Sequence, residues 1–252
     1  MNRALPWLIL LLAVLQPLTG ALAQLTGLGT PIGSATAGIE APEQPLPAFF
    51  AIWGAIFLAY AGFGLVGLLR PADWYPKPGW PLLIAGVSNV IWMLSAQLVA
   101  YQPLDLILLS PVLAAAWIAA ARLDALRPAG PALTFRIADM ATGLLAGWVT
   151  VAVAISVPLT IRSFTGLGPT DFPWPMFWTA FFSAAIAAWI FASRISRSLW
   201  FFAALGWGLA GIILNNWIQS GMHGIALMGG LGAATILLLR VTRGAKHSRS
   251  GR

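Results

Sequence analysis

Apolar residues along the chain form long runs that are interrupted by short polar or Gly/Pro-rich segments. Each run covers about 17 to 25 residues, the length at which an α-helix crosses a hydrocarbon core of ~30 Å. The pattern therefore predicts an all-α, polytopic transmembrane helix bundle of about eight spans. The runs lie near residues 5–24, 46–69, 80–101, 104–121, 137–160, 174–193, 198–217 and 224–240.

Composition supports a membrane protein and argues against several kinds of chemistry. Hydrophobic residues make up 59% of the chain and charged residues 8%, against about 25% charged in soluble domains. Cysteine is absent, which excludes disulfides and thiolate sites, and the 2 histidines and 7 acidic residues do not form a metal-binding motif. We therefore expect a protein that is not an enzyme, with no catalytic residues and no metal.

The positions of the basic residues predict the topology. In an eight-span arrangement with both termini in the cytoplasm, Arg162 is the only basic residue on the outer side, as the positive-inside rule favours. The net charge of +7 is thus explained by membrane topology, and we expect no nucleic-acid partner. The cytoplasmic residues are Arg3, Arg70, Lys77, Arg122, Arg127, Arg136, Arg194, Arg197, Arg240, Arg243, Lys246, Arg249 and Arg252.

The ends of the chain and its first external loop leave alternatives open. The first run resembles a secretory signal with "ALA" before Gln24, so cleavage there would leave seven spans; we expect retention. The loop over residues 25–46 is rich in Gly, Pro, Ser and Thr, and is either a lid over the bundle or a flexible connector. Residues 241–252 form a basic tail that we expect to be disordered and attracted to anionic lipid head groups.

Aromatic residues inside the spans are the candidate binding groups. Phe49, Trp53 and Phe57 recur every four residues, on one stripe of a helix that faces either lipid or a cavity. Asn89 and Trp92 share a face of the third span, where the amide needs a partner because an unpaired buried amide costs about 1–3 kcal/mol. A helix–helix hydrogen bond by Asn89 is the alternative to a ligand contact.

Later spans add packing signals and two further polar residues. Gly143 and Gly147 of the fifth span form a small-xxx-small pattern that favours close helix packing, and Trp148 follows directly. Asn215 and Asn216 end the seventh span near the outer surface, where we expect them to be solvated.

Together these motifs resemble the tryptophan-rich sensory protein family, also called the TspO/MBR or translocator-protein family. Pro47, Phe49, Trp53 and Phe57 are similar to the start of the family's second helix, with phenylalanine at the last position where tyrosine is usual. Asn89 and Trp92 match its third-helix Asn-x-x-Trp pair.

In the fifth helix, Trp148 and Ala152 match the family pattern, whereas Leu144 and Ser156 replace its proline and asparagine. The resemblance, to a longer and divergent branch of the family, covers residues 1–160. It implies a five-helix core over residues 1–160, three additional transmembrane helices over residues 161–240 and the tail over residues 241–252.

The resemblance also implies a receptor or transporter for a flat hydrophobic ligand, either a bound tetrapyrrole such as a porphyrin or a sterol-like molecule. The expected ligand-binding residues are Phe49, Trp53, Phe57, Asn89, Trp92, Trp148 and Ala152. A structural or assembly subunit without a small ligand is the alternative. The expected partners are membrane lipids, the hydrophobic small molecule, and a homo-oligomer or membrane-complex partner. We expect an integral protein of a bacterial inner membrane with its C-terminus in the cytoplasm.

Overall fold

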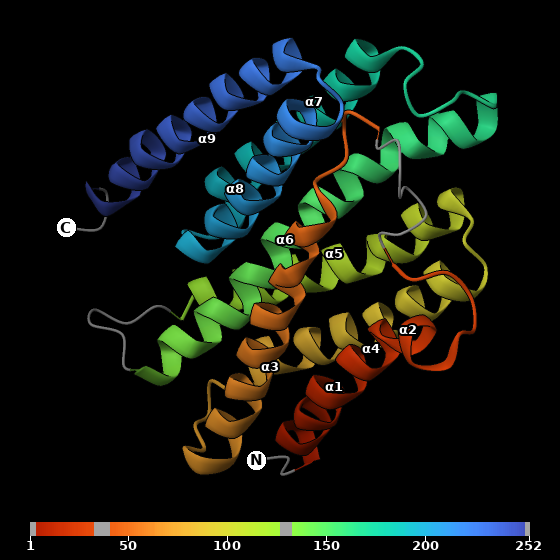
Figure 1. Cartoon of the computed structure of the whole chain (residues 1–252). Coiled ribbons are helices and arrows are strands. Elements are labelled where there is room, and N and C mark those ends of the chain that lie inside the picture. The colour runs from red at the N-terminus through yellow and green to blue at the C-terminus, as the bar shows by residue number, and fades with distance from the viewer. Residues whose placement is uncertain (1–3, 33–40, 127–132, 250–252) are drawn as a thin grey trace.

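The computed structural model describes residues 4–32, 41–126 and 133–249, which form an all-helical bundle (Figure 1). Among these residues, seven helices are long and apolar enough to cross a membrane, and a shorter apolar helix precedes them. The prediction of about eight spans is therefore confirmed in length and composition. The helices are α1 (Ala4–Gly20), α2 (Leu22–Thr26), α3 (Ile52–Leu69), α4 (Pro76–Leu98), α5 (Gln102–Asp124), α6 (Leu133–Thr165), α7 (Pro173–Ile190), α8 (Leu199–Leu214) and α9 (His223–Arg249).

Three short turns extend these helices. A turn of 3-10 helix, η1 (Pro47–Ala51), leads into α3. Two turns of π-helix, η2 (Phe191–Ile195) and η3 (Asn215–Gln219), continue α7 and α8. Large apolar side chains such as Leu58, Ile107 and Leu231 remain exposed on the helices, as expected of surfaces that face hydrocarbon rather than water.

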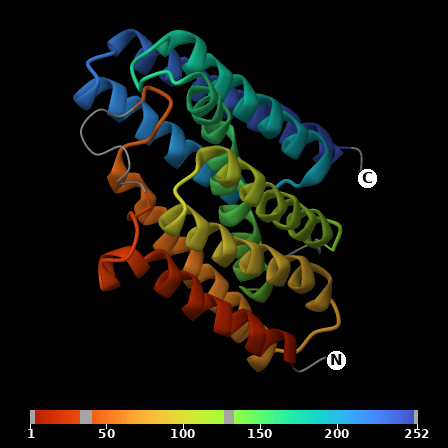
Figure 2. The same ribbon diagram turned by 90° about the vertical axis from the view of Figure 1, so that its right-hand side faces the viewer.

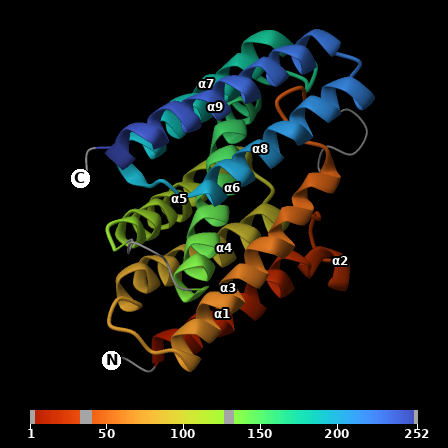
Figure 3. The ribbon, with the colours of Figure 1, turned by 90° about the vertical axis from the view of Figure 1, so that its left-hand side faces the viewer.

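The longest helix, α6, is the centre of the bundle. Its 33 residues pack against α3, α5, α7 and α8, with α1, α3 and α4 on one side and α7, α8 and α9 on the other (Figures 1 and 3). Pro158 lies inside α6, where its missing N–H removes one helical hydrogen bond. α6 therefore contacts elements on both sides of the bundle.

Successive long helices run in opposite directions through the bundle. Both termini lie at one end, and residues 41–46 lie at the other (Figures 2 and 3). This arrangement follows from the short connections, because a helix that follows a tight turn must return antiparallel to its predecessor. Arg3, Arg127 and Arg252 of the topology prediction lie outside the described residues.

The glycines of α6 provide close contact with α8. A side chain at Gly143 would collide with the Ser198 hydroxyl, and one at Gly147 would collide with the backbone carbonyl of Phe201. This confirms the predicted small-xxx-small packing surface.

The C-terminal helix differs from the expected organisation. Residues 241–249 were expected to be a disordered tail, but α9 continues to Arg249. A run without proline that ends in basic residues suits the last turns of a helix, because cations stabilise the negative end of the helix dipole. Residues 250–252 lie outside the described residues.

Candidate functional site

A cavity of about 130 Å³ lies between α3, α4, α5 and α6, and residues of the connection between α2 and η1 also line it. Its aromatic walls come from Trp53 of α3, Trp92 of α4, Trp148 of α6 and Phe50 of η1. Ala152 also lines it, one turn after Trp148. All three tryptophans of the predicted site and its alanine therefore meet around one cavity, although they come from three separate helices.

The aromatic rings of the cavity contact one another in two orientations. Trp53 lies nearly parallel to Trp92, with ring centroids 6.0 Å apart. Trp148 presents an edge to Trp53 at 6.4 Å and to Phe50 at 5.6 Å. Offset-parallel and edge-to-face contacts are the favoured aromatic geometries, so the walls offer ring surfaces on which a planar group could stack.

The predicted stripe of Phe49, Trp53 and Phe57 is divided in the structure. Phe57 stacks on Trp53 at 5.6 Å but does not line the cavity. Phe49 packs against Trp207 of α8, with ring centroids 4.7 Å apart, and its carbonyl oxygen accepts a hydrogen bond from the Trp207 indole at 2.7 Å.

Phe50 occupies the wall position that the sequence pattern assigned to Phe49. The cause is the 3-10 turn η1, which includes both phenylalanines. In a 3-10 turn, residues three apart lie above one another, so Phe50 rather than Phe49 aligns with Trp53.

Asn89 is completely buried but does not line the cavity. Its amide nitrogen donates to Oε1 of Gln16 in α1 at 2.8 Å. Gln97, two turns further along α4, accepts a hydrogen bond from the Ala23 amide at 2.9 Å and donates to the Thr19 carbonyl at 2.8 Å. The structure therefore shows the helix–helix hydrogen bond that was the alternative role for Asn89.

Residues 41–46, here called the lid segment, pack across the end of the bundle. Gln44 and Pro45 of this segment line the cavity, as do Thr30, Pro31 and Ile32 from the other end of the same connection. The described parts of the connection thus favour the lid over the flexible connector. Residues 33–40 of the expected lid lie outside the described residues.

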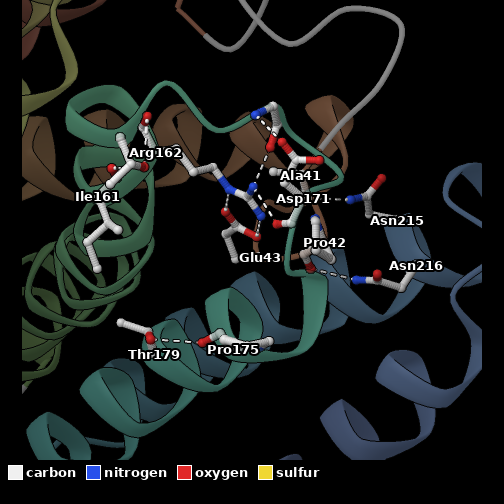
Figure 4. A network of polar contacts seen from close by, with 12 residues as sticks. Ala41, Pro42, Glu43, Ile161, Arg162, Asp171, Pro175, Thr179, Asn215 and Asn216 are labelled. Carbon is white, nitrogen blue, oxygen red and sulfur yellow. Dashed lines mark hydrogen bonds and ion pairs between the residues drawn. The ribbon is translucent and has the colours of Figure 1, made fainter.

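Two asparagines at the start of η3, directly after α8, hold the lid segment (Figure 4). The side-chain amide of Asn215 donates to the carbonyls of Ala41 and Gln44, at 3.2 and 3.0 Å, and that of Asn216 donates to the carbonyl of Pro42 at 2.7 Å. Both asparagines are 0% exposed, so the expectation that they are solvated was wrong. The lid segment covers them because its turn carbonyls need donors that this non-helical backbone does not supply itself.

An ion pair adds a second attachment of the lid segment (Figure 4). Nε of Arg162 in α6 donates to Oε1 of Glu43 at 2.8 Å, and the two side chains are 6% and 0% exposed. The guanidinium also donates to the carbonyls of Gly168 and Asp171. The planar guanidinium matches the geometry of a carboxylate. Arg162, the one basic residue predicted on the outer side, therefore forms a buried ion pair with Glu43, here called the latch.

Asp105 is a cavity residue that sequence reasoning did not identify. It lies in the first turn of α5, is 8% exposed and lines the cavity, and its Oδ1 has no hydrogen-bond partner. The nearby helix N-terminus stabilises a carboxylate by about 0.3–1 kcal/mol, whereas burying one without a partner costs several kcal/mol. The sequence signal that could have identified Asp105 was its position as an acidic residue at the start of an apolar run.

The fold and this site define a polytopic α-helical membrane protein with an aromatic cavity between its helices. Within that class, the chain belongs to the TSPO-like protein family, whose model matches residues 6–242. The match confirms the family resemblance and continues beyond residues 1–160 into α9. No curated protein and no solved structure matched the chain.

Proposed function

We propose that the protein is an integral membrane receptor or transporter that binds a flat hydrophobic ligand in the cavity beneath the lid segment. The observation that carries the proposal is the convergence of Trp53, Trp92 and Trp148 on one cavity. Stacking on such rings contributes about 0.5–1.5 kcal/mol per pair beyond the burial of apolar area. Interior aromatic packing alone would not require a cavity between these rings.

The volume of the cavity bears on which ligands fit. The family resemblance implies tetrapyrroles or sterols, and both are larger than the cavity allows. Pockets for drug-sized ligands have volumes of about 300–1,000 Å³, and this cavity measures about 130 Å³. A ligand of one or two rings suits that volume, whereas a tetrapyrrole or a sterol requires displacement of the lid segment. We therefore propose that the lid segment controls access for large ligands.

We further propose a binding protein rather than an enzyme, located in a bacterial inner membrane with both termini in the cytoplasm. Among the described residues that line the cavity, Asp105 is the only ionisable one, and catalysis by side chains usually requires a matched acid, base or nucleophile. The proposed orientation places the latch residue Arg162 outside and the other basic residues inside, in accord with the positive-inside rule.

Titration of the purified protein in detergent with protoporphyrin IX, followed by the porphyrin absorption band, tests ligand binding. A two-ring probe, naphthalen-2-ylmethanol, measured by calorimetry, tests the smaller class. We expect saturable binding of at least one probe that is weakened by Trp53→Ala and Trp148→Ala. Trp7→Ala, which removes an exposed tryptophan of α1, is the matched control and leaves binding unchanged.

Absence of saturable binding, or binding that is indifferent to both cavity substitutions in folded protein, refutes the proposal. The aromatic residues would then serve packing, and the alternative of an assembly subunit would be tested by isolating the protein with its membrane partners.

A further inference from the structure

Four residues that line the cavity each carry one buried polar atom that the described part of the protein does not satisfy. Two are donors, the Nε1 atoms of Trp53 and Trp92, and two are acceptors, Oε1 of Gln44 and Oδ1 of Asp105. All four residues line the cavity. Because buried polar atoms are nearly always hydrogen-bonded in folded proteins, to protein or to ordered water, we expect each of these atoms to take a partner from outside the protein, either water or a ligand.

Of the four residues, Asp105 has the highest energetic cost when its polar atom stays without a partner. Its carboxylate is more than nine-tenths buried and has no ion pair within the described residues. Arg162, which lies at the lid end of the bundle, is already bound by Glu43 and by two backbone carbonyls. A buried carboxylate without a cation is unfavourable, so a positively charged group or a strong N–H donor is the complementary partner.

We infer that Asp105, assisted by Gln44, binds a protonated nitrogen of the ligand, and that the ligand is a flat aromatic amine of one or two rings. The aromatic walls attract such a cation as well, since tryptophan faces favour cations through their negative π-surface. The inference rests on the proposed function and specifies its ligand class. The protonated nitrogen of the ligand would point towards Asp105 and Gln44, so these two residues would fix an orientation that ring stacking alone does not.

A pair of isosteric probes tests the charge preference. Naphthalen-2-ylmethylamine carries a protonated amine where naphthalen-2-ylmethanol carries a neutral hydroxyl, and both are titrated by calorimetry into wild-type protein in the same detergent. We expect the amine to bind roughly tenfold or more tightly than the alcohol, the range expected for hydrogen bonds to charged groups.

The Asp105→Asn variant removes the charge and keeps the shape of the side chain. We expect it to lose the preference for the amine while its affinity for the alcohol stays within about twofold, an interval smaller than one hydrogen bond. Asp73→Asn, which removes an exposed carboxylate between α3 and α4, is the matched control and retains the preference. Should Asp105→Asn not fold, the wild-type comparison of amine and alcohol still decides.

Equal affinities of the two probes for wild-type protein overturn the inference, and so does a preference that survives Asp105→Asn; ordered water would then be the partner of these atoms. Saturable binding of both probes without a charge preference leaves the proposed function standing. Binding of neither probe, together with no binding of protoporphyrin IX, refutes the proposed function and the inference with it.

Discussion

Replacement of Arg162 by methionine removes the buried latch of the lid segment and keeps much of the apolar volume of the arginine side chain. Glu43 is then left at 0% exposure without the guanidinium that binds its two oxygens. Breaking a buried pair by removing one partner costs about 3–5 kcal/mol. The lid segment can relieve this cost by opening, because Glu43 then reaches water.

At about 1.4 kcal/mol for each factor of ten, the opening equilibrium rises roughly 100- to 4,000-fold. Hydrogen–deuterium exchange measures it at the amides of Gln44 and Leu46, which are bonded to Ala41 and to Gly211 of α8. We expect faster exchange at these two amides, while amides in the middle of α6 exchange at the wild-type rate.

The double variant Arg162→Met/Glu43→Leu is the control for this prediction. It removes both charges, so exchange is expected to return most of the way towards the wild-type rate, since the asparagine bonds to the lid segment remain. Unchanged exchange in the single variant would refute the latch. Equal acceleration in the single and double variants would show that packing of the arginine stem, rather than the ion pair, holds the segment.

Three further predictions concern packing and the cavity wall. Gly147→Val is expected to lower the melting temperature, because overpacking costs about 1–3 kcal/mol, whereas Gly206→Val, at a position with no atom within 4 Å of an added Cβ, leaves it nearly unchanged. Asn89→Leu is expected to lower stability by about 1 kcal/mol and to leave ligand affinity intact in calorimetry; a loss of affinity in folded protein would place Asn89 at the ligand after all. Phe50→Leu is expected to weaken binding of naphthalen-2-ylmethanol more than Phe49→Leu does, and the reverse order would contradict the register assigned to η1.

The bundle itself was predictable from the sequence because lipid imposes a simple rule. Every backbone polar group in hydrocarbon must be satisfied within its own helix, so length and apolar composition sufficed to place the spans. A close-packing surface on α6 was predictable for a similar reason, since Gly143 and Gly147 repeat at the spacing of one helix face, although the pattern does not name α8 as the partner. These features depend on local sequence alone.

The site depended on contacts that no local pattern specifies. The shift from Phe49 to Phe50 follows from one 3-10 turn, and a four-residue spacing assumes an α-helix. Burial of Asn215 follows from a lid segment about 170 residues earlier in the chain, with which it forms two hydrogen bonds. Asp105 lies in the first turn of a helix, where acidic residues are common, and only the positions of Trp53 and Trp92 show that it lines a cavity.

One helix, α6, carries both a residue of the cavity wall, Trp148, and the latch residue Arg162. Trp148 and Arg162 are 14 positions apart in α6, which is about 21 Å at 1.5 Å per residue. Pro158 lies between them, and proline is the usual site at which a helix bends. Residues beyond Pro158 thus form a short arm that carries the ion pair with Glu43, and a bend at the proline would move Arg162 relative to Trp148.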